Sequence, residues 1–326
     1  MTVDVLVAIF SSTPAWTIPT SSLDDLRRRF PGVGFLHAGD EEAMVRLIGT
    51  AEVAFTSILT PAAFAAAPRL RWVHSPAAGV GSMLFPAMLE SEVVLSNSRG
   101  MNAAAVAEHA LMLMLAAARR LPDAVRAQGE RRWIADELSG LPSLRGRTLL
   151  IVGLGAIGRE LAGMAAGLGM RILATRREPG AAVPDGIAEV HDPPALTALL
   201  PSADIVVLAV PLTAETRGMI GTTELARMKP SAWLVNVARG KLVDERALVE
   251  ALERRVIAGA ALDVMEHEPL SPSSPLWVMP NVIITPHVAG FRDDYWQAAT
   301  DLFAANLRRY LDGEAVANIV DKRAGY

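Results

Sequence analysis

Residues 148–161, TLLIVGLGAIGREL, carry the pattern that decides the fold of this chain. A strand-like apolar run leads into Gly153, Gly155 and Gly158, spaced G-x-G-x-x-G, and a helix-like pattern follows. The glycine spacing alone is a weak signal, but the order strand, turn, helix, strand is that of a dinucleotide-binding βαβ unit. In such a unit a pyrophosphate lies at the helix start, where unpaired amides and the helix dipole favour an anion. We therefore predict that this turn binds a dinucleotide.

Short apolar runs alternate with helix-length segments on both sides of the turn, which predicts parallel sheets covered by helices and an α/β fold class. Before the turn, the strand candidates are residues 3–10, 33–37, 53–58 and 70–75. They indicate a small α/β domain of their own over residues 1–98. From the turn onward there are six further candidates, the number of strands in a dinucleotide-binding domain: residues 148–155, 170–176, 203–211, 232–240, 257–264 and 282–287.

Residues 101–121, MNAAAVAEHALMLMLAAARRL, are rich in strong helix formers and apolar nearly all round. Such a helix is typical of a buried position, either in a core or between domains or subunits. Its most apolar run, residues 110–118, is nine residues long. That is well short of the roughly 20 residues that a bilayer span needs, so no membrane segment is predicted.

The composition excludes several function classes. The chain has 326 residues, 51% of them hydrophobic and 20% charged, as expected of about two globular domains. A formal charge of −4 gives no basic surface for nucleic acid. The sequence has no cysteine, which excludes disulfides and thiolate metal sites, and no metal site is predicted. Because the amino terminus lacks a basic segment before its apolar run, it is interpreted as a strand rather than a signal peptide, and a cytoplasmic location is expected.

The second cofactor strand ends in Thr175, Arg176, Arg177 and Glu178. An acid at this point would accept hydrogen bonds from the adenosine ribose hydroxyls, whereas an arginine pair can bind a 2′-phosphate in fork geometry. The pattern therefore favours NADP(H) over NAD(H). Two alternatives stay open: Glu178 supplies the carboxylate of an NAD(H) site, or the two arginines are merely solvated.

Three polar residues, Arg239, Glu268 and His287, lie at or just after the ends of apolar strands. The carboxyl ends of strands in an open α/β sheet face the ligand crevice. Arginine binds a carboxylate through two parallel hydrogen bonds, and histidine transfers a proton near neutral pH. A nearby glutamate favours the charged imidazolium and orients it. We predict that these residues form a catalytic set, although each alone could be a structural or solvated residue.

Seven segments in order make the sequence similar to the D-2-hydroxyacid dehydrogenase family over essentially the whole chain. They are residues 69–80, 96–115, 144–162, 209–221, 225–248, 259–277 and 280–290. The resemblance implies two doubly wound parallel-sheet domains, with a Rossmann cofactor domain inserted into a flavodoxin-like substrate domain. The substrate domain would comprise residues 1–98 plus 290–326, and the cofactor domain residues 99–289. The insertion explains why the glycine turn lies in the middle of the chain.

The resemblance also implies roles for individual residues. Arg239, Glu268 and His287 would be catalytic, and the amides of Ala78 and Gly79 would bind the substrate carboxylate together with Arg239. Asp263 would hold the nicotinamide carboxamide. The remaining cofactor contacts would come from Gly153, Gly155, Ala156, Ile157, Gly158, Arg176, Arg177, Val210, Val237, Ala238 and His287.

The expected activity is reduction of a small 2-oxoacid to a D-2-hydroxyacid, as in the glyoxylate and hydroxypyruvate reductases that use NADP(H). A homodimer formed through the cofactor domain is implied as well. Two other functions remain open at this point. One is a non-enzymatic NAD(P)-sensing protein similar to a transcriptional corepressor, and the other is a dehydrogenase acting on an inorganic oxyanion such as phosphite.

Overall fold

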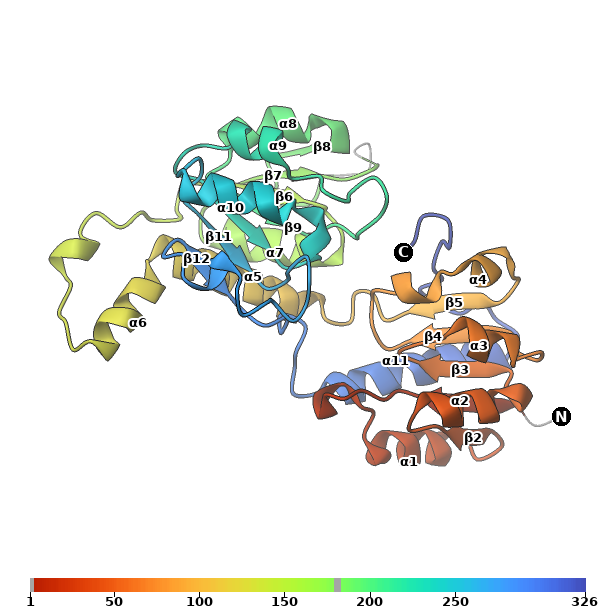
Figure 1. Cartoon of the computed structure of the whole chain (residues 1–326). Coiled ribbons are helices and arrows are strands. Elements are labelled where there is room, and N and C mark those ends of the chain that lie inside the picture. The colour runs from red at the N-terminus through yellow and green to blue at the C-terminus, as the bar shows by residue number, and fades with distance from the viewer. Residues whose placement is uncertain (1–2, 179–182) are drawn as a thin grey trace. The chain divides into compact units, whose positions relative to one another are not determined.

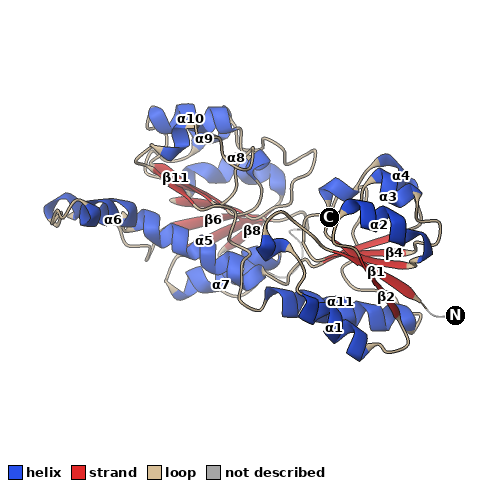
Figure 2. Cartoon of the chain, turned by 60° about the horizontal axis from the view of Figure 1, so that its bottom comes forward, coloured by secondary structure: helices blue, strands red, loops and turns tan. Residues whose placement is uncertain are grey.

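The computed structural model describes residues 3–178 and 183–326, which form two compact units. Unit 1 contains the chain up to Met101 together with Arg292–Tyr326, and unit 2 is the intervening Asn102–Phe291. Each unit is a parallel sheet with helices on both faces (Figures 1 and 2). The prediction of two doubly wound α/β domains, one inserted into the other, is confirmed. The first boundary lies after Met101, three residues beyond the expected residue 98. The second lies after Phe291, two residues beyond the expected residue 289.

Unit 1 has a five-stranded sheet in the flavodoxin-like order β2-β1-β3-β4-β5. Its strands are β1 (Asp4–Ala8), β2 (Gly34–His37), β3 (Val53–Thr56), β4 (Trp72–Ser75) and β5 (Val94–Asn97). Its helices are α1 (Thr20–Arg29), α2 (Glu41–Leu47), α3 (Pro61–Ala65), α4 (Pro86–Glu90) and α11 (Tyr295–Leu311).

The central strand β1 shows why this sequence forms a two-sided layer. Val5 and Val7 pack in the cluster with residues of α1 and α11, whereas Leu6 and Ala8 pack in the cluster with residues of α2, α3 and α4. Figures 1 and 2 show these two groups of helices on opposite faces of the sheet. Because successive side chains point to opposite faces, a strand buried on both faces is a continuous apolar run.

Unit 2 has a seven-stranded parallel sheet in the order β12-β11-β10-β9-β6-β7-β8. The strands are β6 (Thr148–Val152), β7 (Arg171–Thr175), β8 (Glu189–His191), β9 (Ile205–Leu208), β10 (Trp233–Asn236), β11 (Gly259–Leu262) and β12 (Val282–Ile284). All six predicted strands are present, but the sheet has seven strands, so the predicted number was one too low. The strand that the sequence did not reveal, β8, has three half-buried residues at the sheet edge, two of them ionisable, so it lacks an apolar run.

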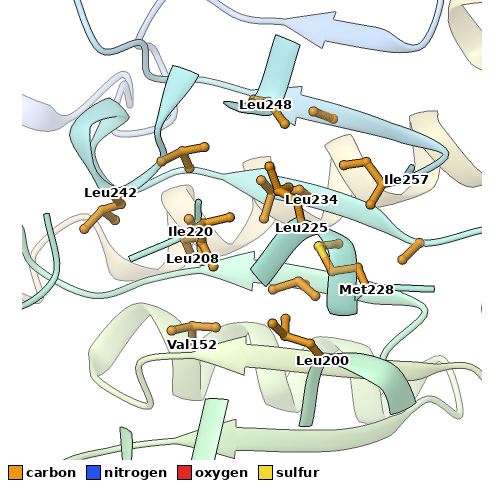
Figure 3. Close-up of a cluster of buried hydrophobic side chains, with 14 of the residues drawn as sticks. Val152, Leu200, Leu208, Ile220, Leu225, Met228, Leu234, Leu242, Leu248 and Ile257 are labelled. Carbon is orange, nitrogen blue, oxygen red and sulfur yellow. The ribbon is translucent and has the colours of Figure 1, made fainter. Parts of the chain in front are cut away.

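The helices of unit 2, with the exception of α6, cover its sheet on both faces. They are α5 (Ala103–Ala118), α6 (Leu121–Gly129), α7 (Ala156–Gly167), α8 (Leu196–Leu199), α9 (Thr222–Arg227) and α10 (Glu245–Glu253). One apolar cluster joins the sheet to α8, α9 and α10, and Figure 3 shows part of it, including Leu208, Leu225 and Leu248. The other cluster joins the opposite face to α5 and α7.

The apolar helix expected at residues 101–121 is α5, and it is only partly buried within unit 2. Leu113 and Met114 are fully buried against the sheet, but 45% of Met112 and 39% of Leu115 are exposed. Within this unit the helix is therefore buried on one side only, and its expected burial between domains or subunits stays a prediction. Across the chain that the structure describes, no helix has both the length and the apolar character needed to cross a bilayer.

The strand register of unit 2 aligns the ends of all seven strands in one row, since Thr175 of β7 also pairs with His191 of β8. Val152 pairs with Thr175 on one side and with Leu208 on the other, and the row continues through Asn236, Leu262 and Ile284. The strand order reverses between β6 and β9. A reversal of this kind is where open α/β sheets bind ligands, beyond the carboxyl ends of the strands.

Candidate active site

The glycine turn follows β6 at this reversal, and its geometry requires glycine. Gly153 has φ of +103°, and a Cβ atom there would lie 2.6 Å from Val210 Cγ1 and 2.7 Å from the Ala209 oxygen. A Cβ atom on Gly158 would overlap the carbonyl of Gly153. At Gly155, the N-cap of α7, a Cβ atom would meet nothing within 4 Å. The turn is therefore tight where helix and strand meet and open at the helix start, which fits a bound pyrophosphate.

The other predicted cofactor residues follow neighbouring strands at the same edge. Val210 comes after β9 and is half-buried, and Val237 and Ala238 come after β10 and are buried. Arg176 is half-buried and Arg177 exposed after β7, where the Arg176 amide donates to the His191 oxygen at 2.9 Å.

Arg239 lies in a turn that Asn236 holds from the end of β10. The Asn236 side chain donates to the Arg239 oxygen at 2.9 Å and accepts from the Ala238 amide at 3.1 Å. One guanidinium nitrogen of Arg239 donates to the Ala238 oxygen at 2.6 Å. Burial lowers the pKa of Arg239, and the charge of Glu268 opposes that effect. Arg239 remains a cation, suited to binding a carboxylate.

A close backbone contact joins this turn to the loop after β11. A Cβ atom on Gly240 would overlap the carbonyl of Met265 and the amide of Glu266, so only glycine fits. The same loop contains Glu268, whose Oε1 accepts from the Met265 amide at 3.0 Å. The contact therefore brings the loop that holds Glu268 against the turn that holds Arg239.

Glu268 and His287 form the central pair of the site. Glu268 Oε2 lies 2.6 Å from His287 Nδ1, with 37% and 47% of the two side chains exposed. Burial would raise the pKa of Glu268. The hydrogen bonds from His287 and the Met265 amide, with the charges of His287 and Arg239, outweigh burial and bring that pKa below its usual value. Glu268 therefore orients the imidazole of His287 through Nδ1, and the other ring nitrogen, Nε2, can donate a proton to a substrate.

Asp263 fixes the turn in which His287 lies. His287 has φ of +55°, and its backbone amide donates to the backbone carbonyl oxygen of Asp263 at 2.8 Å. The Asp263 carboxylate, only 1% exposed, accepts from the Val288 and Ala289 amides at 3.0 Å each and from the Thr285 hydroxyl at 2.6 Å. The sequence predicted Asp263 as a cofactor ligand but gave no sign of this anchoring.

His109 is a residue of this region that the sequence did not single out. It lies on α5, and its Nε2 atom is 2.9 Å from Thr285 Oγ1 and 3.4 Å from Asp263 Oδ1. A weak signal was present, since His109 and Glu108 are the two ionisable residues in a helical run that is apolar elsewhere. That signal carries little weight because most such histidines are structural.

Ala78 and Gly79 belong to unit 1, in the exposed loop after β4. Asn97 donates to the Ala78 oxygen at 2.7 Å, and Tyr295 donates to the Pro76 oxygen at 3.0 Å. Within the described residues, no acceptor pairs with the Ala78 or Gly79 amide. Two amides in a loop held from both sides suit a carboxylate ligand.

Comparison with known proteins agrees with this geometry. The family model for the D-isomer specific 2-hydroxyacid dehydrogenase NAD binding domain matches residues 111–289. The chain is similar to a glyoxylate reductase of Korarchaeum cryptofilum, with 38% identity over 79% of this chain and 78% of that protein. It is also similar to a D-3-phosphoglycerate dehydrogenase of Archaeoglobus fulgidus, with 36% identity over 78% of this chain and 48% of that protein.

Solved structures are similar along nearly the whole chain. An NADPH-dependent glyoxylate/hydroxypyruvate reductase of Sinorhizobium meliloti, in complex with NADP and sulfate, superposes with a TM-score of 0.85 at 27% identity, covering 99% of this chain and 100% of that one. A D-isomer specific 2-hydroxyacid dehydrogenase of Xanthobacter autotrophicus, in complex with NADPH and MES, gives a TM-score of 0.82 at 32% identity over 99% of each chain. The chain therefore belongs to the D-isomer specific 2-hydroxyacid dehydrogenase family, and it is a nicotinamide-dependent oxidoreductase.

Proposed function

We propose that this member of the family reduces a small 2-oxoacid to the D-2-hydroxyacid, with NADPH as the preferred reductant. The observation that carries the proposal is the Glu268–His287 pair, 2.6 Å apart, at the same sheet edge as the Gly153 turn. The similarity to glyoxylate reductases and to a glyoxylate/hydroxypyruvate reductase supports a substrate of this size.

The substrate carboxylate binds to the guanidinium of Arg239 and to the amides of Ala78 and Gly79. A guanidinium can form two parallel hydrogen bonds with a carboxylate, which fixes the orientation of the acid and not only its position. The 2-oxo group is then presented to His287.

His287 acts as the general acid. Its Nδ1 atom is hydrogen-bonded to Glu268, so Nε2 is the atom that donates to the 2-oxo oxygen. The nicotinamide, when bound, supplies a hydride to the carbonyl carbon. His287 transfers its Nε2 proton to the oxygen as negative charge develops there, and Glu268 stabilises the imidazolium that this step needs.

Chain residues also account for how the cofactor binds. The open start of α7 at Gly155 takes the pyrophosphate, with Ala156 and Ile157 beside it, while Val210, Val237 and Ala238 line the bound molecule. Arg176 and Arg177 bind the 2′-phosphate of the adenosine ribose, which an acid at this point would repel. The complexes of similar proteins with NADP and NADPH support this choice.

We also propose that the protein is a homodimer formed through unit 2. Exposed apolar side chains follow one another along α5 and α6, including Leu121 and Val125, and Trp133 beyond them is 95% exposed. Figure 1 shows α6 projecting away from the sheet of unit 2. Light scattering should give twice the mass of the chain for the wild type. A monomer at micromolar concentration would contradict this part of the proposal.

The test of the reaction is steady-state oxidation of NADPH and NADH with glyoxylate, hydroxypyruvate, pyruvate and a bulkier 2-oxoacid. We expect turnover with the small acids and a preference for NADPH of roughly tenfold or more, the contribution of a charged bidentate contact to phosphate. Failure of every 2-oxoacid with both cofactors would overturn the proposed reaction. Oxidation of phosphite in the same assay would assign an inorganic oxyanion instead.

A further inference from the structure

His109, Thr285 and Asp263 form a partly buried chain of polar groups next to the turn that contains His287. His109 Nε2 lies 2.9 Å from Thr285 Oγ1, and the Thr285 hydroxyl lies 2.6 Å from Asp263 Oδ1. The His109 side chain is 14% exposed and that of Asp263 is 1% exposed. The mechanism proposed above does not use His109 or Thr285.

The chemistry of the groups fixes the direction of this chain. A carboxylate only accepts hydrogen bonds, so the Thr285 hydroxyl must donate its proton to Asp263. Its oxygen then accepts from His109, which must carry a proton on Nε2. The chain therefore runs in one direction, from His109 through Thr285 to Asp263.

The two oxygens of Asp263 are used unequally. Oδ1 accepts from the Thr285 hydroxyl and the Val288 amide, and His109 Nε2 lies 3.4 Å away. Oδ2 accepts from the Ala289 amide. A carboxylate oxygen has about two acceptor sites, so Oδ1 is saturated while Oδ2 can accept one more donor.

We propose that His109 is a positioning residue for the reduction, acting through Thr285 to hold the Asp263 carboxylate with Oδ2 directed to the carboxamide of the bound nicotinamide. The inference rests on the proposed function, and on the role of nicotinamide carboxamide acceptor that the family resemblance implies for Asp263. The same carboxylate anchors the turn that contains His287, so one network aligns the cofactor ring and the proton donor. Removing either link weakens the hold on the Asp263 side chain without deleting it, since the Val288 and Ala289 amides still bind the carboxylate.

The test uses isosteric variants with matched controls. Thr285→Val and His109→Phe remove the hydroxyl and the ring N–H, whereas Thr285→Ser and His109→Gln keep a donor in place. For each variant, we would measure the Kd of NADPH by cofactor fluorescence without substrate, the Kd of 2′-phospho-ADP-ribose, which lacks the nicotinamide, and kcat and KM for glyoxylate.

We expect Thr285→Val, which loses a hydrogen bond to a carboxylate, to weaken NADPH binding and to lower kcat by about tenfold each. His109→Phe, which loses a hydrogen bond to a hydroxyl, should change both values by about fivefold. In these two variants, the Kd of 2′-phospho-ADP-ribose and the KM for glyoxylate should stay within about twofold of the wild type. All values for the controls Thr285→Ser and His109→Gln should also stay within about twofold, because the hydrogen bond is preserved and the binding free energy does not change. If the affinities for NADPH and 2′-phospho-ADP-ribose fell equally, the network would be only structural. If neither affinity changed, the network would have no role. Because the binding arm needs no turnover, a wild type that reduces no 2-oxoacid would refute the proposed function and still leave the inference about His109 testable.

Discussion

Replacing Asp263 by asparagine tests the anchoring of the catalytic turn. The two carboxylate oxygens accept from donors on opposite sides, the Val288 amide at Oδ1 and the Ala289 amide at Oδ2. An asparagine has one oxygen, so in either orientation its NH₂ group faces a backbone N–H. A buried donor left without an acceptor costs about 1–3 kcal/mol, and each remaining bond loses about 1 kcal/mol when its acceptor loses its charge.

These costs sum to about 3–5 kcal/mol, which lowers the thermal midpoint of a unit of this size by about 10 °C. Turnover should fall by about tenfold to a hundredfold, because His287 depends on the same turn. The control is Asp204→Asn. It removes a carboxylate that accepts from the Thr148 amide at 2.8 Å, at the amino ends of the strands in the same sheet. The control should lower stability and leave turnover intact. Melting by circular dichroism with parallel assays gives both values, and an unchanged midpoint and turnover in Asp263→Asn would refute the reasoning.

Three further substitutions test individual residues. Arg239→Lys should lose most of kcat/KM although it keeps the charge, because a lysine cannot bind a carboxylate with two parallel bonds; near-full turnover would place carboxylate binding elsewhere. Glu268→Gln should lower kcat by about fivefold, because an exposed ion pair of about 1 kcal/mol no longer stabilises the imidazolium that donates the proton; unchanged turnover would uncouple Glu268 from His287. Arg176→Asp should reverse the preference for NADPH in parallel assays with both cofactors, and equal use of NADH by the wild type would refute the assignment.

The positions that the sequence predicted and the structure contains are local or follow from strand ends, while the roles of these residues stay predictions. The Gly153 turn is local, since its three glycines and both flanking elements lie within one short segment. The positions of Arg239 and His287 were predictable because the carboxyl ends of parallel strands lie in one row. The register aligns Asn236 with Leu262 and Leu262 with Ile284 at the ends of their strands. Polar residues that directly follow those strands are therefore neighbours in space.

The features that the sequence did not reveal depend on contacts between distant segments. His109 and Thr285 are 176 residues apart, and neither carries a motif that points to the other. The requirement for glycine at Gly240 comes from the Met265 backbone passing against it, which no local pattern records. The edge strand β8 was missed for a different reason: a short strand with polar side chains has no apolar periodicity to detect.

The most direct test of the central claim is the rate of 2-oxoacid reduction by His287→Asn. Asparagine tolerates the left-handed backbone that His287 adopts at φ of +55°, so the turn should be preserved. Its amide can donate a hydrogen bond to the 2-oxo group but cannot transfer a proton. We predict that kcat for glyoxylate falls by about 10²–10⁴ while NADPH still binds, as expected when general acid catalysis is lost. Turnover close to that of the wild type would contradict the account, because the proton would then come from a group other than His287.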